Sequence, residues 1–139
     1  PTLSLRVAGR PVDESYAEAV RGIMDECTRR LIRCVFIDQA TAYEPDVAPD
    51  LERRFWMTPP NQPYTLSLGE LQRVARLYNG WLAETARAKG FTFCALAGKV
   101  PPTTEYFYDD CHFNENGARL VSRLIADCLR AEGLAKAER

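Results

Sequence analysis

The sequence predicts an α/β fold with parallel strands. Two short apolar segments, residues 34–37 and 91–96, are rich in strand-forming side chains and are separated by a segment with helical spacing. Helical segments also precede the first strand and follow the second. Strands that alternate with helices are typical of parallel sheets with right-handed crossovers. Because a parallel sheet normally has more than two strands, we expect two consecutive βα units of a larger sheet.

Length and composition are those of a folded domain without an unusual surface charge. The chain has 139 residues, of which 46% are hydrophobic and 27% charged, so residues 1–139 are treated as one domain or domain portion. The 18 basic and 19 acidic side chains leave a net charge of -1. This balance predicts no nucleic-acid or anionic-membrane surface, which would need an excess of Lys and Arg on one face. No apolar stretch approaches the ~20 residues of a transmembrane segment.

The first half of the chain contains one helix, one strand and a long loop. Apolar residues recur every three to four positions over residues 13–33, and Ser15 and Glu18 have the spacing of a capping box. The strand at residues 34–37 comes next. Residues 40–66 then form a proline-rich and aromatic loop, with a short helix expected around residues 49–55. Loops of this length in compact domains are commonly functional.

The second half repeats the order of helix and strand. Ser67 and Glu70 form a second capping box, and Gly90 is placed to end the helix that they begin. The expected elements are a helix at 67–90, a strand at 91–96, a loop at 97–112 and a last helix from about 114–117 to Gly133.

The cysteines do not have the pattern of a disulfide scaffold or a zinc site. There are five of them, an odd number, without CxxC spacing. Cys34 and Cys94 lie in apolar runs, and Cys27 and Cys128 lie on apolar helix faces, so we expect all four to be small core residues. Unpaired thiols favour a reducing compartment; nothing else in the sequence indicates the localisation.

The only histidine, His112, lies in the loop after the second strand, three residues beyond Asp109. In open α/β sheets, ligands bind beyond the carboxyl ends of the strands. A carboxylate at this spacing can accept a hydrogen bond from one ring nitrogen and leave the other free as a base. The alternative is an ordinary surface or core histidine, and the spacing alone leaves both open.

Residues 106–118, with the sequence YFYDDCHFNENGA, resemble the last conserved block of the SGNH (GDSL-type) hydrolases, in which an Asp-x-x-His pair precedes the final helix. The resemblance covers nearly the whole chain: residues 34–39 look like the fourth core strand, and residues 79–98 look like the helix and strand before the block. It implies a flavodoxin-like parallel sheet with flanking helices, of which only the last two βα units are present. Ala95 departs from the Asp that many members have there.

The resemblance also implies roles for individual residues. His112 matches the general base of a serine ester hydrolase, and Asp109 matches the carboxylate that orients it, with a small-molecule ester as substrate and no metal or organic cofactor. Asp110 is a rival for the orienting role. The alternative for either carboxylate is a solvated side chain or one that caps the start of the last helix. A nucleophilic Cys111, or a metal site of Asp109, Cys111 and His112, is less favoured, because adjacent side chains diverge and the chain has no second ligand pair with zinc-like spacing.

The family's nucleophile is absent from this sequence. No Gly-Asp-Ser or Gly-x-Asn-Asp motif occurs, and none of the four serines (Ser4, Ser15, Ser67 and Ser122) has the required setting. Residues 1–10 resemble the segment after the family's Asn block, so we expect roughly 100 residues with the first three strands and the serine to lie upstream. The missing N-terminal half or another chain is expected to cover the edge of the first strand.

The remaining candidates are in the long loop. Gln39 comes directly after the first strand, and Phe55, Trp56 and Met57 lie in the loop that leaves the same edge. We expect these four to line a substrate pocket, whereas the alternative is that the apolar ones fill the core beneath the loop. Two functions fit these features: an ester hydrolase, and a non-catalytic binding or assembly domain that retains the hydrolase scaffold. A Gly-Asp-Ser motif in the upstream sequence would distinguish them.

Overall fold

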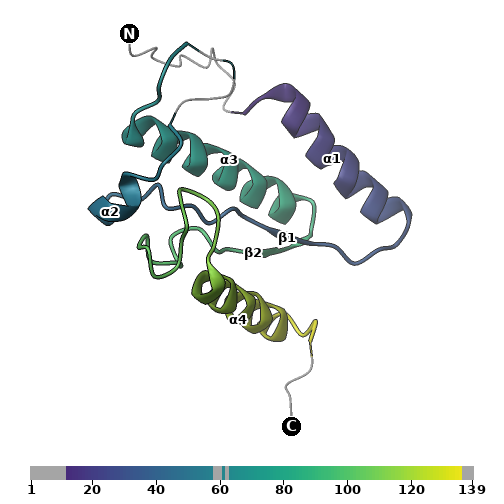
Figure 1. Ribbon diagram of the computed structural model, residues 1–139. Helices are drawn as coiled ribbons and strands as arrows, with labels where there is room; N and C mark the ends of the chain where they lie inside the picture. The colour runs from purple at the N-terminus through teal and green to yellow at the C-terminus, as the bar shows by residue number, and fades with distance from the viewer. Residues whose placement is uncertain (1–11, 58–60, 62, 136–139) are drawn as a thin grey trace.

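The computed structural model describes residues 12–57, 61 and 63–135, and the fold is mixed α/β. Residues 1–10, with Ser4 among them, lie outside the described residues. The elements are α1 (Glu14–Arg29), β1 (Val35–Ile37), α2 (Pro49–Glu52), α3 (Leu68–Ala88), β2 (Thr92–Cys94) and α4 (Glu115–Ala131) (Figure 1). The predicted α/β class with parallel strands is confirmed.

The sheet of the described residues consists of β1 and β2 in parallel. Val35 lies opposite Thr92, Phe36 opposite Phe93 and Ile37 opposite Cys94. Both strands are shorter than the apolar runs that predict them. The second ends early because the backbone after it turns to the side chain of Asp38, which accepts hydrogen bonds from the next two free N–H groups.

Helices lie on both sides of the two strands. Figure 1 shows α1 and α3 on one side and α4 on the other. Val20 and Met24 of α1 pack against Leu82 and Ala86 of α3, above the strand residue Phe36. A second core cluster joins the apolar face of α4 to the loops after the strands; its buried residues are Ala40, Ala42, Leu51, Leu96, Val100 and Phe107.

The helix starts result from local side-chain hydrogen bonds. The Ser67–Glu70 capping box of α3 is present with both of its hydrogen bonds. The capping box expected at Ser15 and Glu18 is wrong: Asp13 is the N-cap of α1, and its carboxylate accepts the backbone N–H groups of Ser15 and Tyr16. An aspartate at the N-cap satisfies free N–H groups of the first turn with a charged acceptor, so the helix begins at Glu14, ahead of Ser15.

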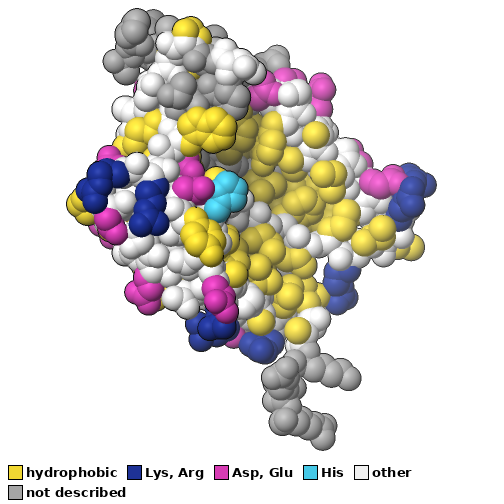
Figure 2. Space-filling model, in the orientation of Figure 1, with side chains coloured by type: hydrophobic (Ala, Val, Ile, Leu, Met, Phe, Trp, Pro, Cys, Tyr) yellow, Lys and Arg dark blue, Asp and Glu magenta, His cyan; other side chains and the backbone are white. Residues whose placement is uncertain are grey.

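The sheet is open on the side of β1. Val35, Phe36 and Ile37 are only half-buried, and the part of the chain described contains no strand beside the outer edge of β1. Along α4, Gly117 alone is buried. Figure 2 shows hydrophobic side chains spread over this face, from the region of α3 across the strands to α4. Strands of parallel sheets are normally covered on both faces, so this face has the character of an interface.

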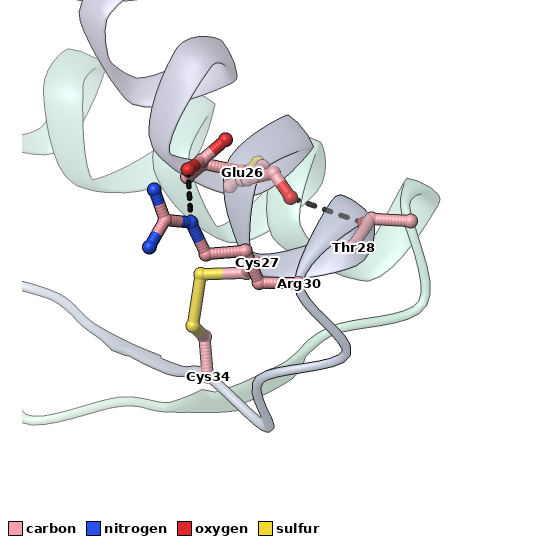
Figure 3. The surroundings of a disulfide bond; sticks show 6 residues. Glu26, Cys27, Thr28, Arg30 and Cys34 are labelled. Carbon is pink, nitrogen blue, oxygen red and sulfur yellow. Dashed lines mark hydrogen bonds and ion pairs between the residues drawn. A yellow bond between two sulfur atoms is a disulfide. The ribbon is translucent and has the colours of Figure 1, made fainter.

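The prediction that four cysteines are unpaired core residues is wrong, because they form two disulfides. Cys27 at the end of α1 bonds to Cys34 before β1 (Figure 3), and Cys94 of β2 bonds to Cys128 of α4. Cys27 and Cys94 are buried, as predicted for small hydrophobic residues, and for this reason the pattern alone did not reveal the pairing. Disulfides persist in oxidising compartments, so the argument for a reducing one no longer holds.

We expect the two disulfides to contribute unequally to stability. The Cys94–Cys128 bond closes a separation of 34 residues and the Cys27–Cys34 bond one of 7. From loop-closure entropy, replacing the first pair by serines should cost about 4 kcal/mol of unfolding free energy and replacing the second about 2 kcal/mol. Denaturant titration of the two double variants measures this. Equal losses of unfolding free energy in the two double variants would contradict the loop-closure argument. Alkylation of all five cysteines without a reductant would contradict the pairing itself.

Candidate active site

The candidate site lies in the two loops that come after the strands, and Asp38 holds these loops together. The Asp38 side chain is buried at the end of β1 and accepts the backbone N–H groups of Leu96 and Ala97, the latter at 2.9 Å. A charged acceptor for two backbone donors is a strong interaction when buried. The loop after β2 therefore begins at a defined distance from the end of β1.

Gln39, one of the predicted substrate-binding residues, is held through its backbone. The side-chain amide of Asn79 in α3 donates to the Gln39 carbonyl at 2.8 Å and accepts the Gln39 N–H at 3.1 Å. The Gln39 side chain is exposed and donates to the carbonyl of Ala40 at 3.0 Å. This residue thus lies at the predicted edge with an amide that faces solvent.

The loop that carries His112 is a short hairpin. Phe107 and Phe113 form an antiparallel bridge, and the N–H of Tyr108 donates to the carbonyl of His112 at 2.9 Å. Asn114 ends the hairpin and is the N-cap of α4: its side-chain oxygen accepts the N–H of Gly117 at 3.0 Å. The alternative in which Asp109 or Asp110 caps this helix is therefore wrong.

Asp109 and His112 are hydrogen-bonded at the tip of the hairpin. The two carboxylate oxygens lie 2.9 and 2.8 Å from Nδ1 of the ring. One of them also accepts the backbone N–H groups of Cys111, at 3.0 Å, and His112, at 2.9 Å. Partial burial alone would raise the pKa of Asp109, but these hydrogen bonds outweigh burial and hold the pKa below its ordinary value.

The protonation pattern is determined by this geometry. An ionised Asp109 can only accept hydrogen bonds, so Nδ1 of His112 carries the proton and Nε2 is left as an acceptor. The His112 side chain is 73% exposed, and the only histidine of the chain is visible at the surface in Figure 2, beside the hydrophobic face. The imidazole can therefore reach a group outside this chain and exchange a proton with it.

Asp110 has a structural position although it adjoins Asp109. It is 6% exposed, its backbone carbonyl accepts the N–H of Ala42 at 2.8 Å, and its carboxylate accepts the hydroxyl of Tyr43 at 2.5 Å. Burial and the hydrogen bond to Asp110 together raise the pKa of Tyr43. Asp110 and Tyr43 thus join the loop after β2 to the loop after β1, a contact that sequence patterns did not reveal because it spans distant positions.

Cys111 is the one free cysteine, and its surroundings do not activate it. Burial, followed by the nearby carboxylates of Asp110 and Asp109, raises its pKa to about 11. A thiol with such a pKa is protonated at neutral pH and is a weak nucleophile. Ligand atoms of Asp109, Cys111 and His112 lie within 4.8 Å of one another. This chemistry favours a carboxylate–imidazole pair over a metal centre, because the carboxylate already accepts three N–H donors and the thiol keeps its proton.

The aromatic residues of the long loop have different positions. Phe55 packs on the core cluster and contacts the ring of Tyr43, with centroids 5.5 Å apart, whereas Trp56 is 70% exposed and Met57 is half-buried. A hollow of about 310 Å³ lies nearby, lined by Gln39, Tyr43 and the α3 side chains Leu71, Val74 and Tyr78. Of the four predicted substrate-binding residues, Gln39 alone lines this hollow.

Comparisons with known proteins give no further assignment. No protein-family model, no curated protein and no solved structure matches the chain.

Gly117 lies where the final helix packs against the hairpin, and we expect any larger side chain at this position to destabilise the fold. A Cβ atom at this position would lie 2.0 Å from the carbonyl oxygen of Tyr106. Gly117→Ala should therefore lower the unfolding free energy by about 2–3 kcal/mol, because a backbone atom must move. Gly80→Ala is the matched control: it lies inside α3 with open space around it, and should raise stability by up to about 1 kcal/mol. Denaturant titration compares the two, and similar effects would refute the close approach.

Proposed function

We propose that this chain supplies the general base and the orienting carboxylate of an ester hydrolase of the SGNH type, with the nucleophilic serine upstream of residue 1. The observation that carries the proposal is the hydrogen bond between Asp109 and Nδ1 of an exposed His112, at 2.8 Å. The pair lies in the loop after β2, joined by Asp110 to the loop after β1. The carboxyl ends of parallel strands are the usual position of such sites.

The chemistry assigned to the pair is acyl transfer. Nε2 of His112 takes the proton of the serine hydroxyl as the serine oxygen attacks the ester carbonyl, and Asp109 stabilises the imidazolium that forms. The imidazolium then protonates the departing alcohol, which leaves an acyl-enzyme. In the second half-reaction, His112 takes a proton from water as the water oxygen attacks the acyl carbon. The imidazolium returns this proton to the serine oxygen as the serine–acyl bond breaks, which releases the acid and regenerates the free serine. The lowered pKa of Asp109 keeps the orienting group ionised throughout.

The open side of the sheet supports a covering half that brings the serine. β1 has an unpaired outer edge among the described residues, and its three side chains are half-buried. The hydrophobic face in Figure 2 adjoins the histidine, so a polypeptide that covers the face also comes close to the imidazole. An additional parallel strand along β1 would satisfy the backbone groups of that edge.

The proposed substrate is a small-molecule ester that contacts the loop after β1. Gln39 offers an exposed side-chain amide next to the hollow of α3. Tyr43 supplies an apolar wall of this hollow, and the ring of Phe55 packs against Tyr43 without lining the hollow itself. Trp56, which is exposed, and Met57 are proposed to contact the substrate outside the hollow. Pockets for small ligands commonly combine such apolar walls with few polar groups.

The two adjacent aspartates provide the sharpest test of the assignment. In the protein with its upstream half, Asp109→Asn should reduce turnover of a short nitrophenyl ester by on the order of 10³-fold, because an amide cannot hold the ring in the required tautomer. Asp110→Asn changes the neighbouring residue in the same way and should stay within roughly tenfold, since Asp110 contacts Tyr43 and not the imidazole.

The histidine and the free thiol complete that test. His112→Ala should lose on the order of 10³-fold or more, and Cys111→Ala should stay within about tenfold. Circular dichroism checks that each variant is folded. Full turnover by a folded His112→Ala protein would end the hydrolase proposal. If the upstream sequence lacks the serine and the folded protein is inactive, the chain is instead assigned to a binding or assembly domain.

A further inference from the structure

The C-terminal end of α1 has an unusual conformation for the residue that occupies it. The N–H of Ile32 donates to the carbonyl of Cys27 at 2.9 Å, and the N–H of Leu31 donates to that of Thr28 at 3.2 Å. These are the two hydrogen bonds of a Schellman motif, whose left-handed position normally holds glycine. Leu31 occupies it with a φ of 57°. A leucine with left-handed backbone is strained, and strain of this kind is concentrated at functional sites.

The side chains of this turn are directed to solvent. Leu31 is 93% exposed and Ile32 is 53% exposed, so the most exposed large hydrophobic side chain of the described residues stands at the strained position. The disulfide between Cys27 and Cys34 closes the turn at its base (Figure 3). The two aliphatic side chains are thus presented on a loop whose conformation is held by a covalent bond.

Arginines lie on both sides of the aliphatic tip, which consists of the side chains of Leu31 and Ile32. Residues 26–34 contain three arginines and one glutamate, which gives a net charge of +2. Arg29 and Arg30 both pair with Glu26, so one of their charges is uncompensated, and Arg33 has no carboxylate partner among the described residues. Figure 2 shows basic side chains on both sides of hydrophobic ones at this corner, on the right. The overall charge of -1 conceals this local arrangement.

We propose that residues 29–33 form a membrane-surface loop that binds anionic phospholipids. Leu31 and Ile32 insert below the headgroups, and the arginines on either side contact the phosphates, an arrangement that combines apolar burial with attraction to anionic lipid. No helix in the described part of the chain is long and apolar enough to cross a membrane. Single-stranded nucleic acid is a poorer fit, because the tip offers no aromatic ring for stacking.

The loop and the candidate active site lie at opposite ends of the strands. Residues 29–33 precede β1, whereas His112 lies in the loop after β2 in the same parallel sheet. Membrane attachment through the loop therefore leaves the imidazole directed away from the bilayer. It also makes the proposal independent of the hydrolase assignment, because lipid binding requires neither the serine nor His112.

Sedimentation with lipid vesicles tests the proposal. The chain should bind vesicles of phosphatidylcholine mixed with phosphatidylglycerol, and bind those of phosphatidylcholine alone much less. Added salt should weaken the binding, since part of it is electrostatic. Leu31→Gly should lower the vesicle partition coefficient roughly tenfold, and should at the same time raise the melting temperature, because glycine adopts the left-handed conformation without strain. A loss of binding caused by misfolding cannot produce both effects.

Two further variants complete the experiment. Arg30→Ser combined with Arg33→Ser should abolish the preference for anionic lipid, whereas Trp56→Ser removes an exposed aromatic side chain elsewhere and should leave the binding unchanged. The proposal is overturned if Leu31→Gly binds like the parent chain, if Trp56→Ser lowers binding as much as Leu31→Gly, or if the parent chain fails to sediment with anionic vesicles. If the parent chain fails to sediment with anionic vesicles, the aliphatic tip is assigned to a protein partner instead.

Discussion

The buried carboxylate of Asp38 is the interaction on which the rest of the site depends. At the end of a parallel strand pair, the backbone N–H groups that leave the sheet need acceptors, and the interior offers no water. Asp38 accepts two of them, from Leu96 and Ala97, and this ends the pairing of β2 with β1. The loop after β2 then crosses to the loop after β1, where Asp110 and Tyr43 join the two. The hairpin that presents His112 rests on these two buried carboxylates.

The features that could be predicted from the sequence are local. The Ser67–Glu70 capping box and the Asp109–His112 contact each join residues three positions apart, and their geometry is set by one turn of backbone. The alternation of helices and strands was predictable for a similar reason, because each element has its own periodicity of apolar residues. Whether the Asp109–His112 pair performs catalysis stays a prediction, because the geometry of the pair does not by itself identify a reaction.

The features that could not be predicted join distant residues or depend on the face that a residue occupies. A cysteine in an apolar run has the same pattern whether it is a thiol or half of a disulfide, so the bond from Cys94 to Cys128 can be inferred only from the packing of α4 on β2. The contact of Asp110 with Tyr43 spans 67 positions. Leu31 stands where glycine is expected, and no periodicity of the sequence indicates a left-handed leucine.

Two adjacent aspartates with the same chemistry have opposite roles because their surroundings differ. Asp109 accepts N–H groups of its own loop and the ring of His112, and these donors favour the ionised form that an imidazolium requires. Asp110 is turned inward, where its carboxylate accepts the Tyr43 hydroxyl and its backbone contacts the neighbouring loop. The inward residue holds the loop in place, and this leaves the outward one free to interact with a histidine that is exposed to solvent. The alternation of the two side chains along the backbone therefore determines which carboxylate acts on the imidazole.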